Sequence, residues 1–216
     1  FSGPYDNIYF SHKLNNHTKI ESFTAQLNSK RFGDSIYNRF LSGHKVSYLS
    51  RKEKVFINIG EIFLYTGINR SVDIRYLNPI IPYFIVDVNK DNIGNDNSNS
   101  ILFLDMRYNF LNDQSIYCEF LLDDYQLDDT GVSNALGLKI GYDYKSMLMG
   151  KNFFFNLEKN ILNDDTYSHS GVHSYFLHNE RPIGYKYGQA CSSTSIIINY
   201  HLNNYFQFKY SFLQLN

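Results

Sequence analysis

Apolar and polar side chains alternate through residues 101–126, ILFLDMRYNFLNDQSIYCEFLLDDYQ, in two runs that an Asn-Asp pair joins. In the first run, Leu104 and Met106 share one parity, while Asp105 and Arg107 share the other. Successive side chains of a β-strand point to opposite faces, so this period of two predicts a hairpin with one apolar and one charged face. The apolar face must then be covered, either by protein, as in a sandwich, or by lipid.

The same alternation recurs from end to end, and no helical periodicity of useful length accompanies it. The sequence has no run of about 20 apolar residues, which excludes a transmembrane helix, but the strands of a membrane barrel need only about 9–11 alternating residues. We expect about ten strands. Besides the two runs above, they fall near residues 7–14, 19–28, 44–50, 54–66, 135–144, 152–160, 196–202 and 206–212.

Short and long connections alternate between these strands. The short ones are 15–18, 51–53, 111–114, 145–151 and 203–204, and the long polar ones are 29–43, 67–100, 124–134 and 163–192. Transmembrane barrels have short turns at one rim and long loops at the other. A soluble sandwich has no reason to sort its loops in this way.

The residue types on the two faces of the strands also favour lipid, rather than a second protein layer, as the cover of the apolar face. One parity is almost uninterrupted Leu, Ile, Phe and Tyr, with Tyr often near strand ends, as in the aromatic girdle of a membrane barrel. The sequence therefore predicts an all-β, antiparallel transmembrane β-barrel, with a soluble β-sandwich carbohydrate-binding module as an alternative. In the barrel, these side chains point outward: Leu104, Phe120, Leu138, Phe155, Ile198 and Phe208. These point inward: Asp105, Arg107, Glu119, Lys139 and Asn199.

Composition narrows the classes of partner and site. The net charge of −1 gives no reason to expect a nucleic-acid surface or an electrostatic membrane anchor. Cys118 and Cys191 have no metal or redox spacing, and we expect Cys118 to be a buried or lipid-facing thiol.

Two clusters are candidate metal sites. Asp123-Asp124 with Asp128-Asp129 could suit calcium, but the EF-hand spacing is missing, which favours a solvated loop. A zinc site could draw on His169, His173 and His178 with Asp164 and Asp165, but their spacing matches no helix pair. We expect no metal and no cofactor.

A charged and aromatic group on the hairpin has two interpretations. A three-residue turn at 112–114 would set Arg107 opposite Glu119, with Asp105 and Tyr117 on the same face and Lys139 on the next strand. The group is then either a cross-strand ion pair of a solvated lumen wall or a wall that binds sugar hydroxyls and rings. Asp105 and Glu119 could also serve as the two carboxylates of a glycosidase, but no positioned pocket is implied. We expect a protein that is not an enzyme.

Several segments, taken in order, resemble the Wzi-type capsule-assembly outer-membrane proteins. They are RFLSGHKVSY (39–48), GEIFLYTG (60–67), IRYLNP (74–79), CEFLLDDYQ (118–126) and TYSHSG…ERPIGYKYG (166–188). The resemblance covers nearly the whole chain and departs from the family at Gly188-Gln189-Ala190-Cys191, where members often have an acidic residue. About ten strands are too few for this family's large barrel. The resemblance therefore implies that residues 1–216 are one barrel domain and the C-terminal part of a larger barrel.

The resemblance implies a protein of the outer membrane of Gram-negative bacteria that is not an enzyme. It would hold capsular or extracellular polysaccharide at the cell surface, in contact with outer-membrane lipid and with polysaccharide export machinery as a further partner. Relatives in gliding bacteria look like surface-adhesion or motility proteins, so the resemblance implies this use as an alternative. A porin-like channel is a second alternative, because residues 67–100 could supply an inward constricting loop.

Two sets of residues follow as candidates. An acid in so apolar a strand as that of Glu61 must face the lumen or pair with a base, and His44 and Arg39, from the same set of motifs, are its candidate partners. Polysaccharide binding is expected at the long-loop rim, on flat tyrosine rings that could otherwise belong to the interfacial girdle. These tyrosines are Tyr125, Tyr167, Tyr175, Tyr185 and Tyr187.

Overall fold

A computed structural model describes residues 6–83, 98–124, 135–167, 174–201 and 207–215. These residues form strands and one short 3-10 helix, η1 (Ile74–Leu77). The first strands are β1 (Asn7–Lys13), β2 (Thr18–Phe32), β3 (Ser35–Leu49), β4 (Val55–Ile68), β5 (Ser98–Leu111) and β6 (Gln114–Asp124). The others are β7 (Ala135–Leu148), β8 (Lys151–Leu162), β9 (Leu177–His178), β10 (Arg181–Pro182), β11 (Cys191–His201) and β12 (Gln207–Leu215). The described residues include no helix with the length and hydropathy needed to cross a membrane.

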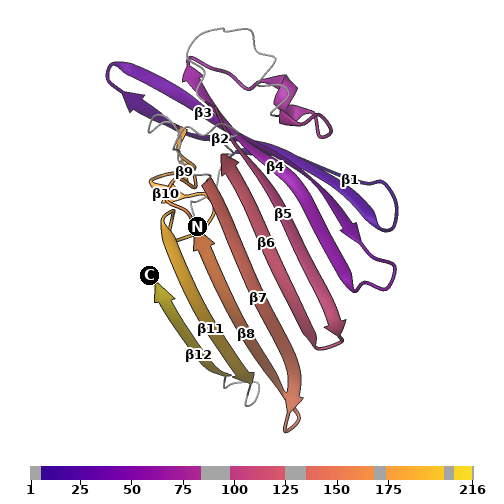
Figure 1. The fold of residues 1–216 in the computed structure, drawn as a ribbon. Coiled ribbons are helices and arrows are strands. Elements are labelled where there is room, and N and C mark those ends of the chain that lie inside the picture. The colour runs from indigo at the N-terminus through magenta and orange to yellow at the C-terminus, as the bar shows by residue number, and fades with distance from the viewer. Residues whose placement is uncertain (1–5, 84–97, 125–134, 168–173, 202–206, 216) are drawn as a thin grey trace, which may run out of the picture.

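Ten strands pair as one antiparallel sheet in the order β1-β2-β3-β4-β5-β6-β7-β8-β11-β12. Every strand therefore lies beside its neighbour along the chain, apart from the excursion that carries β9 and β10 between β8 and β11 (Figure 1). The sheet twists strongly from β12 to β1, as pleated strands of L-residues do. All ten predicted strands are present, and the all-β, antiparallel fold class is confirmed.

The register separates the side chains into two faces. Leu104, Phe120 and Leu138 lie opposite one another on β5, β6 and β7, and we call their side of the sheet the apolar face. Asp105, Glu119 and Lys139 form the next row, on the polar face. The predicted assignment of side chains to the two faces is therefore confirmed.

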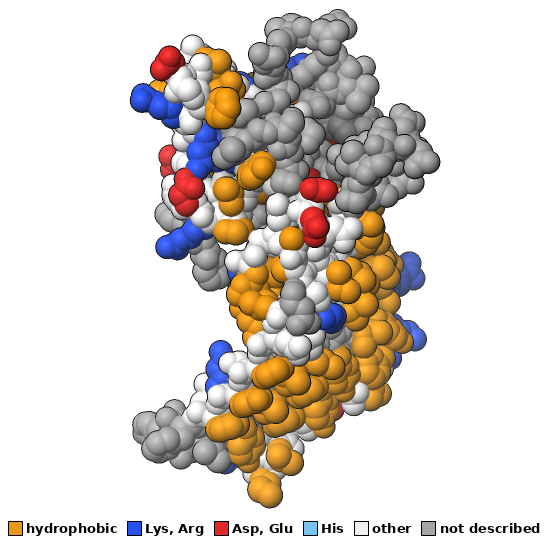
Figure 2. Space-filling model, turned by 60° about the vertical axis from the view of Figure 1, so that its left-hand side comes forward, with side chains coloured by type: hydrophobic (Ala, Val, Ile, Leu, Met, Phe, Trp, Pro, Cys, Tyr) orange, Lys and Arg blue, Asp and Glu red, His pale blue; other side chains and the backbone are white. Residues whose placement is uncertain are grey.

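Solvent reaches much of the apolar face in the described part of the chain. Phe120 is 42% exposed and Phe208 55% exposed. Figure 2 shows hydrophobic side chains gathered over the lower part of the molecule. A sandwich would cover this face with a second sheet, but the only other sheet among the described residues is the β9–β10 pair, which packs on the polar face. Among the described residues, the apolar face thus has no second sheet of the kind that a sandwich packs on it.

Connections differ in length at the two ends of the sheet, largely as predicted. The ends of β5–β6 and β7–β8 meet at tight turns, while β4–β5 and β8–β11 are joined by long segments at the opposite end. The predicted loop at 29–43 is wrong: β2 and β3 continue through it and turn at Gly33, whose φ is +59°. Polar side chains in this stretch suggested a loop, but its backbone stays in the ladder, where Arg31 pairs with Ile36.

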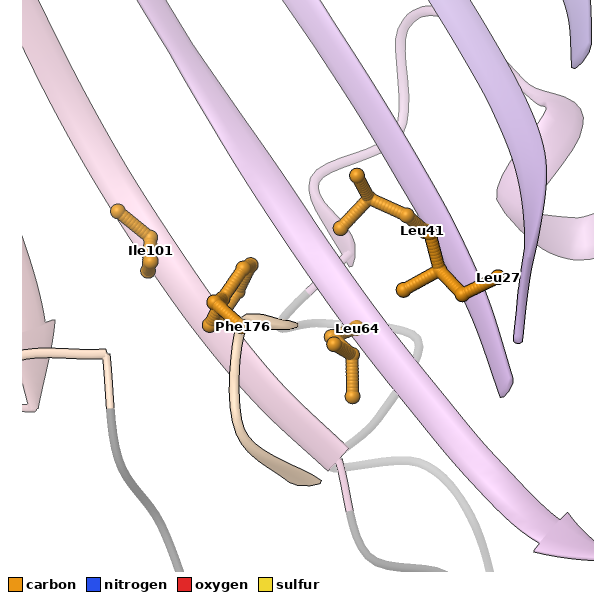
Figure 3. Packing of buried hydrophobic residues seen from close by; sticks show 5 residues of the cluster. All are labelled: Leu27, Leu41, Leu64, Ile101 and Phe176. Carbon is orange, nitrogen blue, oxygen red and sulfur yellow. The ribbon is translucent and has the colours of Figure 1, made fainter. Parts of the chain in front are cut away.

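Two hydrophobic clusters lie near the long-loop end, one on each side of the sheet. On the polar side, Phe176 packs among residues of β2 to β5 (Figure 3). On the other side, Tyr76 of η1 and Tyr83 pack on β3 and β4. Both clusters therefore join a connecting segment to the sheet. Their buried members are Leu27, Leu41, Leu64, Ile101 and Phe176 in the first, and Phe40, Phe63, Tyr65, Tyr76 and Tyr83 in the second.

Candidate functional site

The segment 174–183 folds over the polar face instead of leaving the sheet, and a two-residue hairpin shapes it. Asn179 and Glu180 join β9 to β10 with φ values of 48° and 61°. Two successive positive φ values match the twist of a tight hairpin, and asparagine adopts them more readily than most residues. Phe176, just before β9, is 2% exposed and anchors the segment on β2 to β5 (Figure 3).

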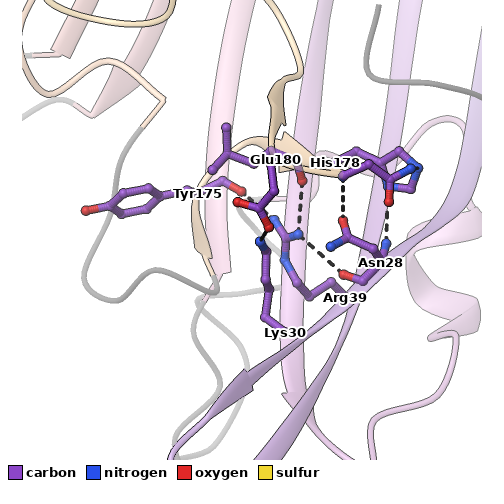
Figure 4. Close-up of polar contacts among 8 residues, drawn as sticks. Asn28, Lys30, Arg39, Tyr175, His178 and Glu180 are labelled. Carbon is purple, nitrogen blue, oxygen red and sulfur yellow. Dashed lines mark hydrogen bonds and ion pairs between the residues drawn. The ribbon is translucent and has the colours of Figure 1, made fainter.

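Arg39 of β3 fixes the same segment by hydrogen bonds to its backbone. The guanidinium is fully buried; Nη1 donates to the Leu177 carbonyl at 2.9 Å, and Nη2 donates to the Tyr175 carbonyl (Figure 4). A buried cation needs such acceptors, because an unpaired one would lose its hydration without compensation. Arg39 thus joins the backbone of the segment to β3 by a specific contact.

Residues of β2 complete this contact around Asn28. Its backbone N–H donates to His178 Nδ1 at 3.2 Å, and its side-chain oxygen accepts the Asn179 N–H at 3.0 Å (Figure 4). Lys30 forms an ion pair with Glu180 at the exposed edge, which holds the pKa of the Glu180 carboxyl below its usual range. We call these residues, with Arg39, the docking latch.

We expect Arg39→Met to loosen the segment 174–183 by about 1–3 kcal/mol, because carbonyls buried in the docked state lose a charged donor. Hydrogen exchange would detect this as faster exchange of the segment's amides, with the protection of β5 to β8 retained. The matched control is Arg31→Met, at an exposed position of β2. Equal protection in the two variants would contradict the latch.

Beside the latch, a pocket of about 300 Å³ lies between the polar face of β6 to β8 and the segment that leads from β8 to β11. Such a volume is at the small end of the range for ligand sites in proteins. Side chains from three strands form its floor and two tyrosines its cover. The residues that define it are Glu119, Leu121, Lys139, Asn160, Tyr167 and Tyr185.

The floor of the pocket is a polar row across three strands. Lys139 Nζ lies 2.6 Å from Glu119 Oε2, and both side chains are partly exposed to the pocket. Asn160 follows on β8, where its amide donates to Ser193 Oγ at 3.3 Å. The floor therefore places a cation and an anion beside the largely buried Asn160 amide, close to Tyr185, whose hydroxyl also bonds Ser193 Oγ.

The cover of the pocket depends on an unusual backbone at Tyr167. Its φ of +71° is costly for a bulky residue, and the Asp123 carboxylate stabilises this conformation by accepting the Tyr167 N–H. Gly184, with φ +127°, approaches the ring so closely that a Cβ there would lie 2.9 Å from Tyr167 Cζ. Burial raises the pKa of the Tyr167 phenol to about 12, so the hydroxyl stays protonated at neutral pH.

The predicted tyrosines do not form one surface. Tyr167 and Tyr185 cover the pocket, while Tyr187 is 37% exposed beside it, with its ring 5.5 Å from that of Tyr185. Tyr175 contributes its carbonyl to the latch, and its ring points away from Arg39 in Figure 4. Tyr125 lies outside the described residues.

The predicted charged group shares one face, but its pairing differs from the prediction. Arg107 lies opposite Tyr117, with Cζ 4.8 Å from the ring centroid, and forms its ion pair with Asp143 at 2.7 Å. Glu119 lies opposite Asp105 and pairs with Lys139. The predicted Arg107–Glu119 pair is wrong because the turn has two residues, with Leu111 opposite Gln114 and an irregularity at Asn109.

Glu61, His44 and Arg39 do not line one lumen wall. Arg39 lies on the polar face, where the docking latch forms. Glu61 of β4 and His44 of β3 lie opposite each other on the apolar face, in the row next to that of Ile59 and Val46. Of the two predicted arrangements for Glu61, the structure shows the pairing with a base, since its carboxylate lies 3.8 Å from His44 Nε2. On the apolar face, residues 76–83 cover both side chains and shield them from solvent.

Sequence reasoning missed Asn160 and Phe176. Asn160 continues the polar parity of β8, so the alternation could have identified it. The residues around Phe176 show neither the period of two of a strand nor the period of 3.6 of a helix. The Asn-Glu pair of its hairpin also lacks the glycine that marks such turns.

The metal candidates stay partly untested. In the described ranges, no group of three or more His, Cys, Asp or Glu side chains is arranged to hold a metal ion. His169, His173, Asp128 and Asp129 lie outside those ranges.

Comparison of the chain with protein-family models, with curated proteins and with solved structures found no match.

Proposed function

We propose that this chain forms part of the wall of an outer-membrane β-barrel that is not an enzyme, and that the pocket under Tyr167 and Tyr185 binds a saccharide segment of a surface polysaccharide. The observation that carries the proposal is the exposed apolar face of a ten-stranded meander, backed by a polar face that a chain segment covers. Soluble monomers rarely expose so continuous an apolar surface.

Strand length supports the membrane orientation. A barrel strand crosses a bilayer with about 9–11 residues, and the central strands β4 to β8 each contain at least 11. Within the described residues, β1 and β12 each pair on one side only. Because an unpaired backbone is costly in hydrocarbon, insertion requires these edges to pair with each other or with further strands of a larger barrel.

The pocket supports the choice of ligand. Sugar hydroxyls both donate and accept hydrogen bonds, so an ion pair beside an amide offers them complementary partners. Apolar faces of sugar rings pack on aromatic rings, which Tyr167 and Tyr185 supply from above. The ordered motifs that resemble Wzi-type proteins point to capsular polysaccharide, and adhesion or gliding is the alternative use of the same site.

We expect Tyr185→Ala to weaken polysaccharide binding about two- to tenfold, because one ring contact contributes roughly 0.5–1.5 kcal/mol. The chain would be inserted in vesicles and titrated with purified capsular polysaccharides, with neutral dextran as the polymer control. Tyr175→Ala is the matched variant, since its ring lies outside the pocket lining. Binding that Tyr185→Ala leaves unchanged, or no binding of any polysaccharide by the unaltered chain, would reject the ligand.

A porin-like channel is the second candidate, and one observation favours it. A charged pocket of about 340 Å³ opens at the short-turn end of the polar face, with Arg107, Asp143 and Lys145 among its lining. Planar-bilayer recording separates the two functions. Steady large openings would favour a pore, whereas a polysaccharide-holding wall with a docked segment conducts little.

A further inference from the structure

The segment 69–83, which follows β4, turns back over the side of the sheet that carries the apolar face. Tyr76 and Tyr83 are fully buried there. The ring centroid of Tyr76 lies 4.7 Å from that of Phe63 and 4.6 Å from that of Tyr65. Both partners belong to the parity of Ile59 on β4, so the segment covers part of the surface that the proposed orientation turns toward lipid.

A buried polar pair lies under this cover. Glu61, near the middle of β4, is 1% exposed and lies 3.8 Å from His44 Nε2. Its carboxylate accepts the Tyr83 N–H at 2.7 Å and the Ser100 hydroxyl at 2.8 Å. A carboxylate facing hydrocarbon at this position would be costly, so the segment removes an electrostatic obstacle from the lipid-facing side.

Three isoleucines are exposed on the outer side of the segment. Ile74 is 79% exposed, Ile80 73% and Ile81 43%. Val46 and Ile59, the next exposed residues along β3 and β4, continue this apolar surface onto the sheet. The segment therefore covers part of the apolar face and presents apolar side chains of its own in that place.

The backbone of the segment satisfies many of its donors internally. Asn78 Oδ1 accepts the N–H groups of Ile80 and Ile81 at 2.9 and 3.3 Å. The Tyr76 N–H donates to the Asp73 carbonyl at 3.1 Å, and two further positions are prolines without an N–H. Lipid-exposed irregular backbone does not occur in the hydrocarbon core, so a segment of this kind fits the interfacial depth of a bilayer.

We propose that the segment 69–83 is a lipid-binding element that immerses Ile74, Ile80 and Ile81 in the outer leaflet while it seals Glu61 and His44 from the hydrocarbon. This inference rests on the membrane orientation proposed above. Its charge fits a lipid surface, since the segment carries two arginines and one aspartate. Arg75 is paired with Asp73, so the excess positive charge of the segment is that of Arg70, which lies over the Tyr65 ring.

The chain contains no tryptophan, so a single introduced tryptophan reports on one position. We expect Ile80→Trp, in the full chain inserted in phosphatidylcholine and phosphatidylglycerol vesicles, to be quenched by brominated acyl chains. Bromine near the headgroup should quench it more than bromine near the chain ends, because the segment lies at the interface. Leu138→Trp reports on the apolar face, and Phe56→Trp, on the polar parity of β4, is the unquenched control.

The outcomes separate the inference from the proposed function. If Leu138→Trp is quenched but Ile80→Trp is not, the segment does not bind lipid and the barrel orientation still holds. A protein partner would be indicated if Ile80→Trp were also shielded from iodide in water. If Leu138→Trp is not quenched, the membrane orientation itself is wrong, and the inference is overturned with it.

Discussion

Phe176→Ala is expected to release the segment 174–183 from the polar face at a cost of about 3–5 kcal/mol, the range found when a buried phenylalanine is truncated. Phe176 is 2% exposed, and its ring fills the space among Leu41, Leu64 and Ile101 of three neighbouring strands. The latch alone would have to compensate for the cavity. We therefore expect fast hydrogen exchange throughout the segment, with the ladder from β5 to β8 still protected.

The same variant should lose polysaccharide binding, because Tyr167 packs against Phe176 with ring centroids 6.3 Å apart and covers the pocket. Phe176→Leu is the control, since it keeps most of the apolar volume and should cost much less. A docked segment with unchanged exchange in Phe176→Ala would show that the latch, not the core cluster, holds it. If the segment undocks and polysaccharide binding is unchanged, the binding site does not lie in the pocket under Tyr167 and Tyr185.

Leu138→Arg is expected to destabilise the inserted chain by roughly 2–4 kcal/mol, provided that this position lies near the bilayer midplane. Leu138 is 39% exposed in the central row of the apolar face, between Phe120 and Ile161. An arginine there must either lose its hydration in hydrocarbon or distort the bilayer. Unfolding from vesicles by urea measures the difference in free energy.

Lys139→Leu is the matched control on the adjacent residue and the opposite face. Its ion pair with Glu119 is partly exposed, so its loss should cost no more than about 1 kcal/mol. Equal tolerance of the two substitutions in vesicles would count against lipid on the apolar face. Equal tolerance in detergent alone would decide nothing, because detergent can rearrange around a charge.

Alternation predicted the strands and both faces, since a period of two needs only local sequence. Leu104 and Asp105 show this most simply, because each lies on the side of the sheet that its parity indicates. The partner of Arg107 could not be predicted in the same way. The shorter turn and the irregularity at Asn109 together move each cross-strand partner by two residues, which gave Arg107 the ring of Tyr117 and the carboxylate of Asp143 instead of Glu119.

The period of the sequence could not predict which chain segments cover the sheet. Glu61 and His44 follow the parity of the apolar face, and their chemistry suggested either the lumen or the pairing that the structure shows. Their cover by the chain itself depends on contacts of Tyr83 from another segment. The pocket was predicted only in part: its tyrosines, Glu119 and Lys139 were named, but the hairpin that brings them together carries no local signal.

Cys118 gives the most direct test of the central claim, that lipid contacts the apolar face, and it is a native residue of that face. It lies between Met106 and Ile140 on the neighbouring strands. In a Cys191→Ser variant it is the only thiol. With the chain folded in vesicles, we predict that a charged maleimide leaves Cys118 unlabelled, because the reagent does not enter hydrocarbon and the reactive thiolate does not form there, and that it labels Cys118 in urea. Labelling of Cys118 by the charged reagent as fast in vesicles as in urea would contradict the claim.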